Sequence, residues 1–292
     1  MRHHLLTLAI LLSGLFSASA QIFYKIEGNG LEKPSYILGT HHLAPLSNVD
    51  SIAGLHEAFR EVGQVVGEID MTIDQMTLGL KMQSYMIAPS DSTLSSILDP
   101  ETYSRVSEEF RQWAPMEGIE LPTLDGFKPN VITTMVAVGM VQRGMPDFNP
   151  QEQLDSYFQL QGRELGHKII ALETPEQQAE LLYSSTPIAE QAKSLVEMLD
   201  DPEKQMTNVR RLNEAYIAHD IDTLFEITRD EDTNPEFMER LLNKRNADWL
   251  QKLPAIMAEA PTFIVVGALH LPGEHGVLEG LRQAGYTVTS AE

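Results

Sequence analysis

The sequence predicts an α/β fold, with a sheet whose strands are joined by parallel crossovers. Several short apolar runs, rich in β-branched residues, end at glycine or a charged residue, which is typical of buried strands. Stretches with helical apolar spacing separate these runs, and a strand–helix–strand unit of this length implies a parallel crossover. No low-complexity run or linker divides the chain. We therefore expect one α/β domain over residues 21–292, with a helical insertion at about residues 72–165.

The first twenty residues have the pattern of a secretory signal peptide. Arg2 supplies the positive charge, Leu5 to Phe16 form a short apolar stretch, and Ala18 to Ala20 form a small-residue cleavage signature. The apolar stretch is too short for a membrane anchor. We expect residues 1–20 to be removed after Ala20, and the mature chain to be periplasmic or secreted.

The composition excludes several classes of partner and site. The formal net charge of −21 predicts a surface that repels nucleic acid and anionic lipid. The chain contains no cysteine, so it forms no disulfides, and a metal site would be limited to His, Asp and Glu ligands.

The N-terminal part predicts a β-hairpin followed by a helix and a third strand. Residues 22–26 alternate like a strand, Gly28-Asn29-Gly30 is a turn signal, and residues 35–38 form the second arm. Apolar residues at helical spacing over 52–62 predict a helix. The run 65–70 then predicts a strand that ends in carboxylates.

The remaining elements follow the same two patterns. Residues 72–165 are rich in methionine, have helical apolar spacing and are cut by prolines, so we expect helices that form a lid or wall over one edge of the sheet. The expected elements after this insertion are a strand at 168–172, three or four amphipathic helices over 176–250, a strand at 263–266, a helix at about 276–284 and a last strand at 286–288.

Two distant segments share one pattern. Leu38 to Leu43 and Val266 to Leu271 each follow an apolar run and continue with glycine, two residues, histidine and leucine. In open α/β sheets, ligands bind outside the carboxyl ends of the strands. We therefore expect His42 and His270 to reach the same cleft. His41 would point to the opposite face, which favours a packing or supporting role.

Carboxylates follow two further predicted strands, at Glu68 and Glu173. Two imidazoles and one carboxylate are a recognised ligand set for a catalytic divalent ion, which activates water for hydrolysis. We therefore predict His42, His270 and Glu68 as metal ligands, with Glu173 as general base. If Glu68 is not a ligand, it takes the role of base instead. A role at the N-terminus of the following helix is the alternative for Glu173.

Five segments together resemble the TraB/PrgY/GumN family, which includes the Tiki metalloproteases. They are Gly39 to His42, Glu68, Leu172-Glu173-Thr174, Arg245-Asn246 and Val266 to Gly273. The resemblance covers about residues 22–290. It implies a fold similar to erythromycin esterase and the haem-binding protein ChaN, with a central sheet wrapped by helices.

The resemblance also implies metal-dependent proteolysis with Mn²⁺ or Co²⁺; Zn²⁺ is a third candidate. His42 and His270 match the motif histidines, Glu68 matches the motif acid, and Arg245 matches an arginine that would bind a substrate carboxylate or an oxyanion. The leading hypothesis is thus an exported metal-dependent hydrolase that acts on a peptide.

Two alternatives stay open. One is a metal-free hydrolase of a small ester, in which a motif histidine activates water. The other is a non-catalytic protein that binds a peptide or haem, with His41, His42 or a nearby tyrosine as the haem ligand.

Overall fold

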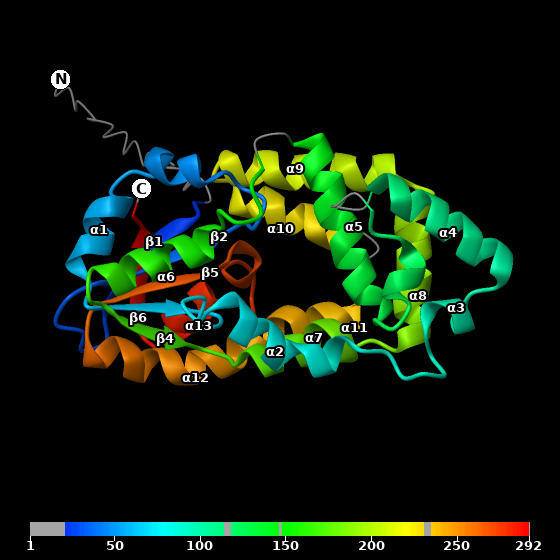
Figure 1. Cartoon of the computed structure of the whole chain (residues 1–292). Helices are drawn as coiled ribbons and strands as arrows, with labels where there is room; N and C mark the ends of the chain where they lie inside the picture. Colours follow the sequence, from blue (N-terminus) through cyan, green and yellow to red (C-terminus); the bar gives the residue numbers. More distant parts are fainter. Residues whose placement is uncertain (1–20, 114–117, 146–147, 231–234, 292) are drawn as a thin grey trace, which may run out of the picture.

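The computed structural model describes residues 21–113, 118–145, 148–230 and 235–291. The predicted signal peptide, residues 1–20, lies outside them. Within these ranges the fold is the predicted α/β class, with helices around a central sheet. Figure 1 shows a part that contains the sheet beside a part made of helices.

The sheet is mostly parallel. The described residues form six strands in the order β4-β3-β5-β2-β1-β6. Strands β4, β3, β5 and β2 run parallel to one another, whereas β1 is antiparallel to both of its neighbours, β2 and β6. The bounds are β1 Phe23–Gly28, β2 Ser35–Thr40, β3 Gln64–Gly67, β4 Lys168–Ala171, β5 Thr262–Gly267 and β6 Tyr286–Ser290.

Strands β1 and β2 form the predicted N-terminal hairpin, with Phe23 opposite Leu38 and Ile26 opposite Ser35. The turn depends on positive φ angles of 81° at Gly28 and 85° at Gly30, which glycine adopts without steric cost. The Leu31 N–H closes it by donating to the Gly28 carbonyl at 3.0 Å.

Helices fill the connections between the parallel strands. Before β4 they are η1 Leu46–Ser51, α1 Leu55–Glu61, α2 Gln75–Met86, α3 Leu94–Ile97, α4 Pro100–Trp113, η2 Leu121–Leu124, α5 Pro129–Gly144 and α6 Leu154–Glu164. After β4 they are α7 Pro175–Ser184, α8 Ile188–Asp200, α9 Pro202–Ile217, α10 Ile221–Asp230, α11 Pro235–Met238, the π-helix η3 Glu239–Asn243, α12 Lys244–Glu259, η4 Ala268–His270 and α13 Val277–Gln283. None of the helices in the described ranges is both long and apolar enough to cross a membrane.

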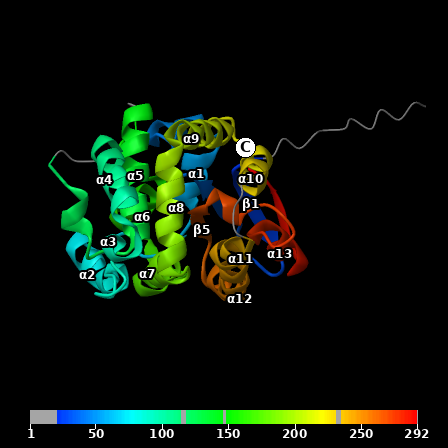
Figure 2. The same ribbon diagram turned by 90° about the vertical axis from the view of Figure 1, so that its right-hand side faces the viewer.

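The helical part has its own core, and this core does not coincide with the predicted insertion. Buried side chains from α3, α4 and α5 pack there against Ala192, Leu195 and Leu199 of α8 and Met206 of α9. Helix α9 also reaches the sheet core with Tyr216, and Figures 1 and 2 show it running across both parts. The helical part therefore combines segments from both sides of β4, because an amphipathic helix buries its apolar face against any complementary face in reach.

Helix α6, the last segment of the predicted insertion, belongs to the sheet layer. It packs against β3, β4 and β5. Its Phe158 ring lies 5.0 Å from Phe263 of β5 and 5.2 Å from Phe59 of α1, measured between ring centroids. This aromatic cluster fixes α6 over the sheet and brings the N-terminal end of α6 to the end of β2, where Thr40 bonds to Asp155.

The two glycine–histidine segments meet in space. A Cβ atom on Gly39 would lie 2.8 Å from the Leu271 side chain and 2.9 Å from the Ala268 Cα atom, so only glycine allows β2 to approach η4 this closely. A Cβ on Gly267 would meet its neighbours no closer than 3.3 Å. The first motif glycine is thus a packing requirement of the fold.

We expect Gly39→Ala to lower the free energy of unfolding by about 1–3 kcal/mol, because the methyl group forces β2 away from η4. Gly79→Ala is the control: Gly79 lies within α2 with no atom near its Cβ position, and alanine there should raise stability by about 0.5–1 kcal/mol. Urea denaturation measures both. Equal effects of the two substitutions would contradict this account of Gly39.

Candidate functional site

Four of the predicted site residues lie at one edge of the sheet. Because β2, β3, β4 and β5 are parallel, their carboxyl ends meet there. Glu68 directly follows β3, His42 and Glu173 lie two residues beyond β2 and β4, and His270 lies three residues beyond β5.

Arg245 of α12 joins the two carboxylates of this edge. Its Nε lies 2.7 Å from Glu173 Oε1, and its Nη2 lies 2.9 Å from Glu173 Oε2 and 2.5 Å from Glu68 Oε2. Trp249 Nε1 donates to Glu173 Oε1 at 2.9 Å, and the Trp249 ring lies under the guanidinium. All three charged side chains are largely buried, so each charge depends on the other two.

Every N–H group of the Arg245 guanidinium has an acceptor within the protein. Besides the bonds to the carboxylates, Nη1 donates to the Leu241 carbonyl at 3.0 Å and lies 2.9 Å from His270 Nε2. A guanidinium has five such donors. In this arrangement a substrate can bond to Arg245 only if one of these bonds breaks.

Glu68 is held from several sides. Its Oε1 accepts from the Gly267 N–H at 2.8 Å, and its Oε2 accepts from Gln178 Nε2 at 3.2 Å as well as from Arg245. Burial by itself would raise the pKa of Glu68, but the neighbouring positive charge and the Gly267 N–H outweigh it and lower the pKa to about 2. Glu68 is therefore a carboxylate at neutral pH.

Glu173 does not cap the following helix. Thr174 does so, because its hydroxyl accepts from the Gln177 N–H while the Gln177 side chain accepts from the Thr174 N–H. Pro175 at the first helical position completes this start of α7. Glu173 is thus left to bond with Arg245.

His270 is buried with both ring nitrogens engaged. Nδ1 lies 2.6 Å from Asn246 Oδ1, and because an amide oxygen only accepts, this assigns the proton to Nδ1. Nε2 then accepts from Arg245. Burial lowers the pKa of His270 to about 4, so the ring is neutral at neutral pH.

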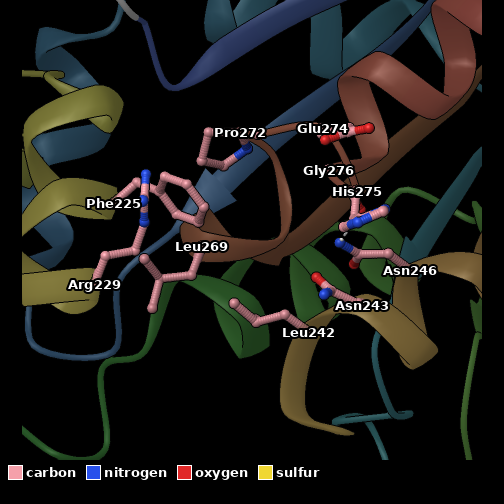
Figure 3. A pocket seen from close by; sticks show the side chains of 11 residues that line it. Phe225, Arg229, Leu242, Asn243, Asn246, Leu269, Pro272, Glu274, His275 and Gly276 are labelled. Atoms are coloured by element: carbon pink, nitrogen blue, oxygen red, sulfur yellow. Dashed lines mark hydrogen bonds between the residues drawn. The ribbon is translucent and has the colours of Figure 1, made fainter. Parts of the chain in front are cut away.

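Asn246 also fixes the loop after η4. Its Nδ2 donates to the carbonyl oxygens of His270 at 3.2 Å and His275 at 2.8 Å. Figure 3 shows Asn246 beside His275 at the wall of a cavity of about 270 Å³, with Phe225 and Arg229 of α10 among the other lining residues. Arg245, the preceding residue, lines a different cavity.

His42 lies in a different environment from His270. Its side chain is 64% exposed, and its Nδ1 lies 3.4 Å from Asp155 Oδ2 of α6. Asp155 itself is buried, and its Oδ1 accepts from Thr40 Oγ1 at 2.8 Å. The neighbouring Asp155 carboxylate raises the pKa of His42 to about 9.

One cavity of about 320 Å³ brings the outer residues of this edge together. Its polar lining comprises His42, Glu68, Gln153, Asp155, Gln159, Gln178 and Arg245, and its apolar lining comprises Ile69, Met71, Leu78, Met82, Leu181, Leu182 and Leu241. His270 and Glu173 are not among the lining residues and contact the site through Arg245. His41 does not line the cavity either. Its Nε2 is buried without a hydrogen-bond partner among the described residues, and its ring packs 5.4 Å from that of Tyr216.

The predicted ligands do not fit a metal ion in this arrangement. Within the described ranges, no group of three or more His, Asp or Glu residues is placed to hold one. Nε2 of His270 and Oε2 of Glu68 are bonded to the positively charged Arg245. Binding of an ion by His42, His270 and Glu68 would require Arg245 to move, and metal binding stays a prediction.

Asp155 and Gln178 are site residues that the sequence interpretation missed. The sequence could have indicated Asp155, because it is a carboxylate beside Leu154 on the apolar face of a helix, where a charge needs a partner. No sequence pattern indicates Gln178, since a glutamine on an amphipathic helix is common.

We expect Arg245→Met to lower the free energy of unfolding by about 3–5 kcal/mol, because Glu68 and Glu173 would lose their shared cation while staying buried. Arg111→Met is the control, since it breaks the exposed Arg111–Glu120 pair and should have a much smaller effect on stability. Urea denaturation at neutral pH compares them. A loss at Arg245 as small as that at Arg111 would show that the network contributes no stability.

Comparison with known proteins tests the resemblance to the TraB/PrgY/GumN family. The model of the TraB/PrgY/gumN family matches residues 22–290, which contain every residue of this site. No curated protein and no solved structure matches the chain. The family match covers nearly the whole described chain and confirms the predicted resemblance. The chain belongs to the TraB/PrgY/gumN family.

Proposed function

We propose that this protein is a hydrolase in which His42, held by Asp155, activates water to cleave an ester or amide bond. The observation that carries the proposal is the His42–Asp155 pair on the lining of the cavity, with Nδ1 and Oδ2 3.4 Å apart. A carboxylate on Nδ1 fixes the tautomer and leaves Nε2 as the base, and it stabilises the imidazolium that forms.

The reaction needs only these two groups for proton transfer. Neutral His42 takes a proton from water at Nε2 while the water oxygen attacks the carbonyl carbon of the substrate. The tetrahedral intermediate then collapses, the bond from carbon to the leaving oxygen or nitrogen breaks, and the imidazolium returns its proton to the leaving group. The products are an acid and an alcohol or amine.

In this proposal Glu68, Glu173 and Arg245 supply fixed charge and do not transfer protons. Glu68 has its pKa lowered to about 2, so it is a poor base at neutral pH, and Glu173 lies behind Arg245. We therefore assign the base to His42 in place of Glu68 or Glu173, and treat Arg245 as a positioning residue. Gln178 lines the cavity and donates one N–H to Glu68, so its second N–H is available for the developing oxyanion.

The proposal corresponds to the metal-free alternative of the sequence interpretation. It favours an ester or a peptide as substrate. The signal-peptide pattern of residues 1–20 supports action outside the cytoplasm.

At pH 9, where about half of His42 is neutral, we expect His42→Ala and Asp155→Asn to lower kcat/KM by about 10²–10⁴-fold, and EDTA to leave the wild-type rate unchanged. His56→Ala is the matched control, because His56 forms another His–Asp pair, with Asp50 at 3.1 Å, away from the cavity. Assays of residues 21–292 use p-nitrophenyl esters and a peptide library.

Two results would contradict the proposal. Activity lost with EDTA and restored by Mn²⁺, Co²⁺ or Zn²⁺ would establish the metal-dependent alternative. Peptides bound but recovered intact, with no ester turnover, would establish the binding protein.

The dependence of kcat/KM on pH should also depend on the His42–Asp155 pair. Because Asp155 raises the pKa of His42 to about 9, only about 1% of the base is neutral at pH 7, so kcat/KM should rise with pH up to about 9. In Asp155→Asn the midpoint should move down towards the ordinary histidine value of about 6.5. Glu164→Gln, which removes an exposed carboxylate of the same helix, should leave the midpoint in place. If the midpoint does not move in Asp155→Asn, Asp155 does not set the pKa of the catalytic base.

A further inference from the structure

The cavity has a polar side and an apolar side, and they come from different elements. The polar side chains His42, Glu68, Asp155 and Arg245 come from the strand ends and from α6 and α12. The apolar side comes mainly from α2, α7 and η3. A substrate that fills this cavity therefore presents its reacting group to one side and an apolar group to the other.

The apolar side consists of single faces of two adjacent helices. Leu78 and Met82 lie four residues apart on α2, and Leu181 and Leu182 lie three and four residues after Gln178 on α7, so each set shares a helix face. The two helices pack against each other, as Figure 1 shows, and the Lys81–Glu176 pair joins them at 3.3 Å. Gln178 of α7 ties this wall to Glu68.

The chemistry of this wall favours an aliphatic group. All of its side chains are leucine, isoleucine or methionine, and no aromatic ring is among the described residues that line it. There is thus no surface for stacking and no charge beyond the polar side to bind a second ionic group. Methionine side chains adapt to flexible chains. The volume of about 320 Å³ is in the range of small-molecule sites.

We propose that the reacting carbonyl of the substrate carries a flexible aliphatic chain, which lies in the cavity against the wall formed by α2 and α7. This inference rests on the proposed function, because it names the substrate class of the same cavity. The aliphatic chain gains affinity by burial, and its position brings the carbonyl to His42.

The test compares p-nitrophenyl esters from acetate to octanoate. We expect kcat/KM to rise by about fourfold for each added methylene group, as expected for burial of a CH₂ group. Met82→Trp should occupy the space beside the wall and remove the preference for octanoate, so that the ratio of kcat/KM for octanoate to kcat/KM for acetate falls to about one. Met76→Trp is the matched control: Met76 lies on the same helix, is 77% exposed and does not line the cavity, so the preference should stay.

A second measurement separates this inference from the proposed function. Calorimetry with octanoate and the His42→Ala variant reports binding without turnover, and we expect octanoate to bind at least tenfold more tightly than acetate. Octanoate binding without ester hydrolysis by the wild type would support the aliphatic site and overturn the proposed reaction. Hydrolysis that is equal for acetate and octanoate, and unchanged in Met82→Trp, would overturn the aliphatic site and leave the reaction standing.

Discussion

The buried Arg245 guanidinium is the interaction on which this site depends. It connects the ends of β3 and β4 with α12 and η4 through Glu68, Glu173 and His270. Two carboxylates at the carboxyl edge of a sheet repel each other and lose hydration, and a buried charge persists only when it is paired and hydrogen-bonded. The guanidinium meets both conditions because its planar fork matches a carboxylate with two bonds.

The bonds of Arg245 divide the site into two layers. In the inner layer, Arg245 bonds to Glu173 and His270. The outer layer, the His42–Asp155 pair, lines the cavity. Fixed charge behind a titratable pair is an arrangement that can stabilise a charged transition state without reorganisation.

The two motif histidines show how environment separates similar sequences. Both follow a parallel strand at the same spacing from glycine. The chain after β5 turns into η4 and buries His270 behind Arg245, where burial lowers its pKa. The chain after β2 leaves His42 exposed beside Asp155, which raises its pKa. The two rings therefore differ in protonation at neutral pH, and of the two only His42 lines the cavity.

Local patterns in the sequence determined the fold class, the hairpin, the strand ends and the family, because periodicity, turn glycines and short motifs act over a few residues. The tertiary structure decided the partners: Asp155 lies 115 residues from Thr40, and Arg245 lies 177 residues from Glu68. The packing of the helices decided both of these contacts. It also decided that α6 covers the sheet while the other helices of the predicted insertion form a separate core. Side-chain bonds between distant segments depend on packing geometry, which no local pattern in one chain encodes.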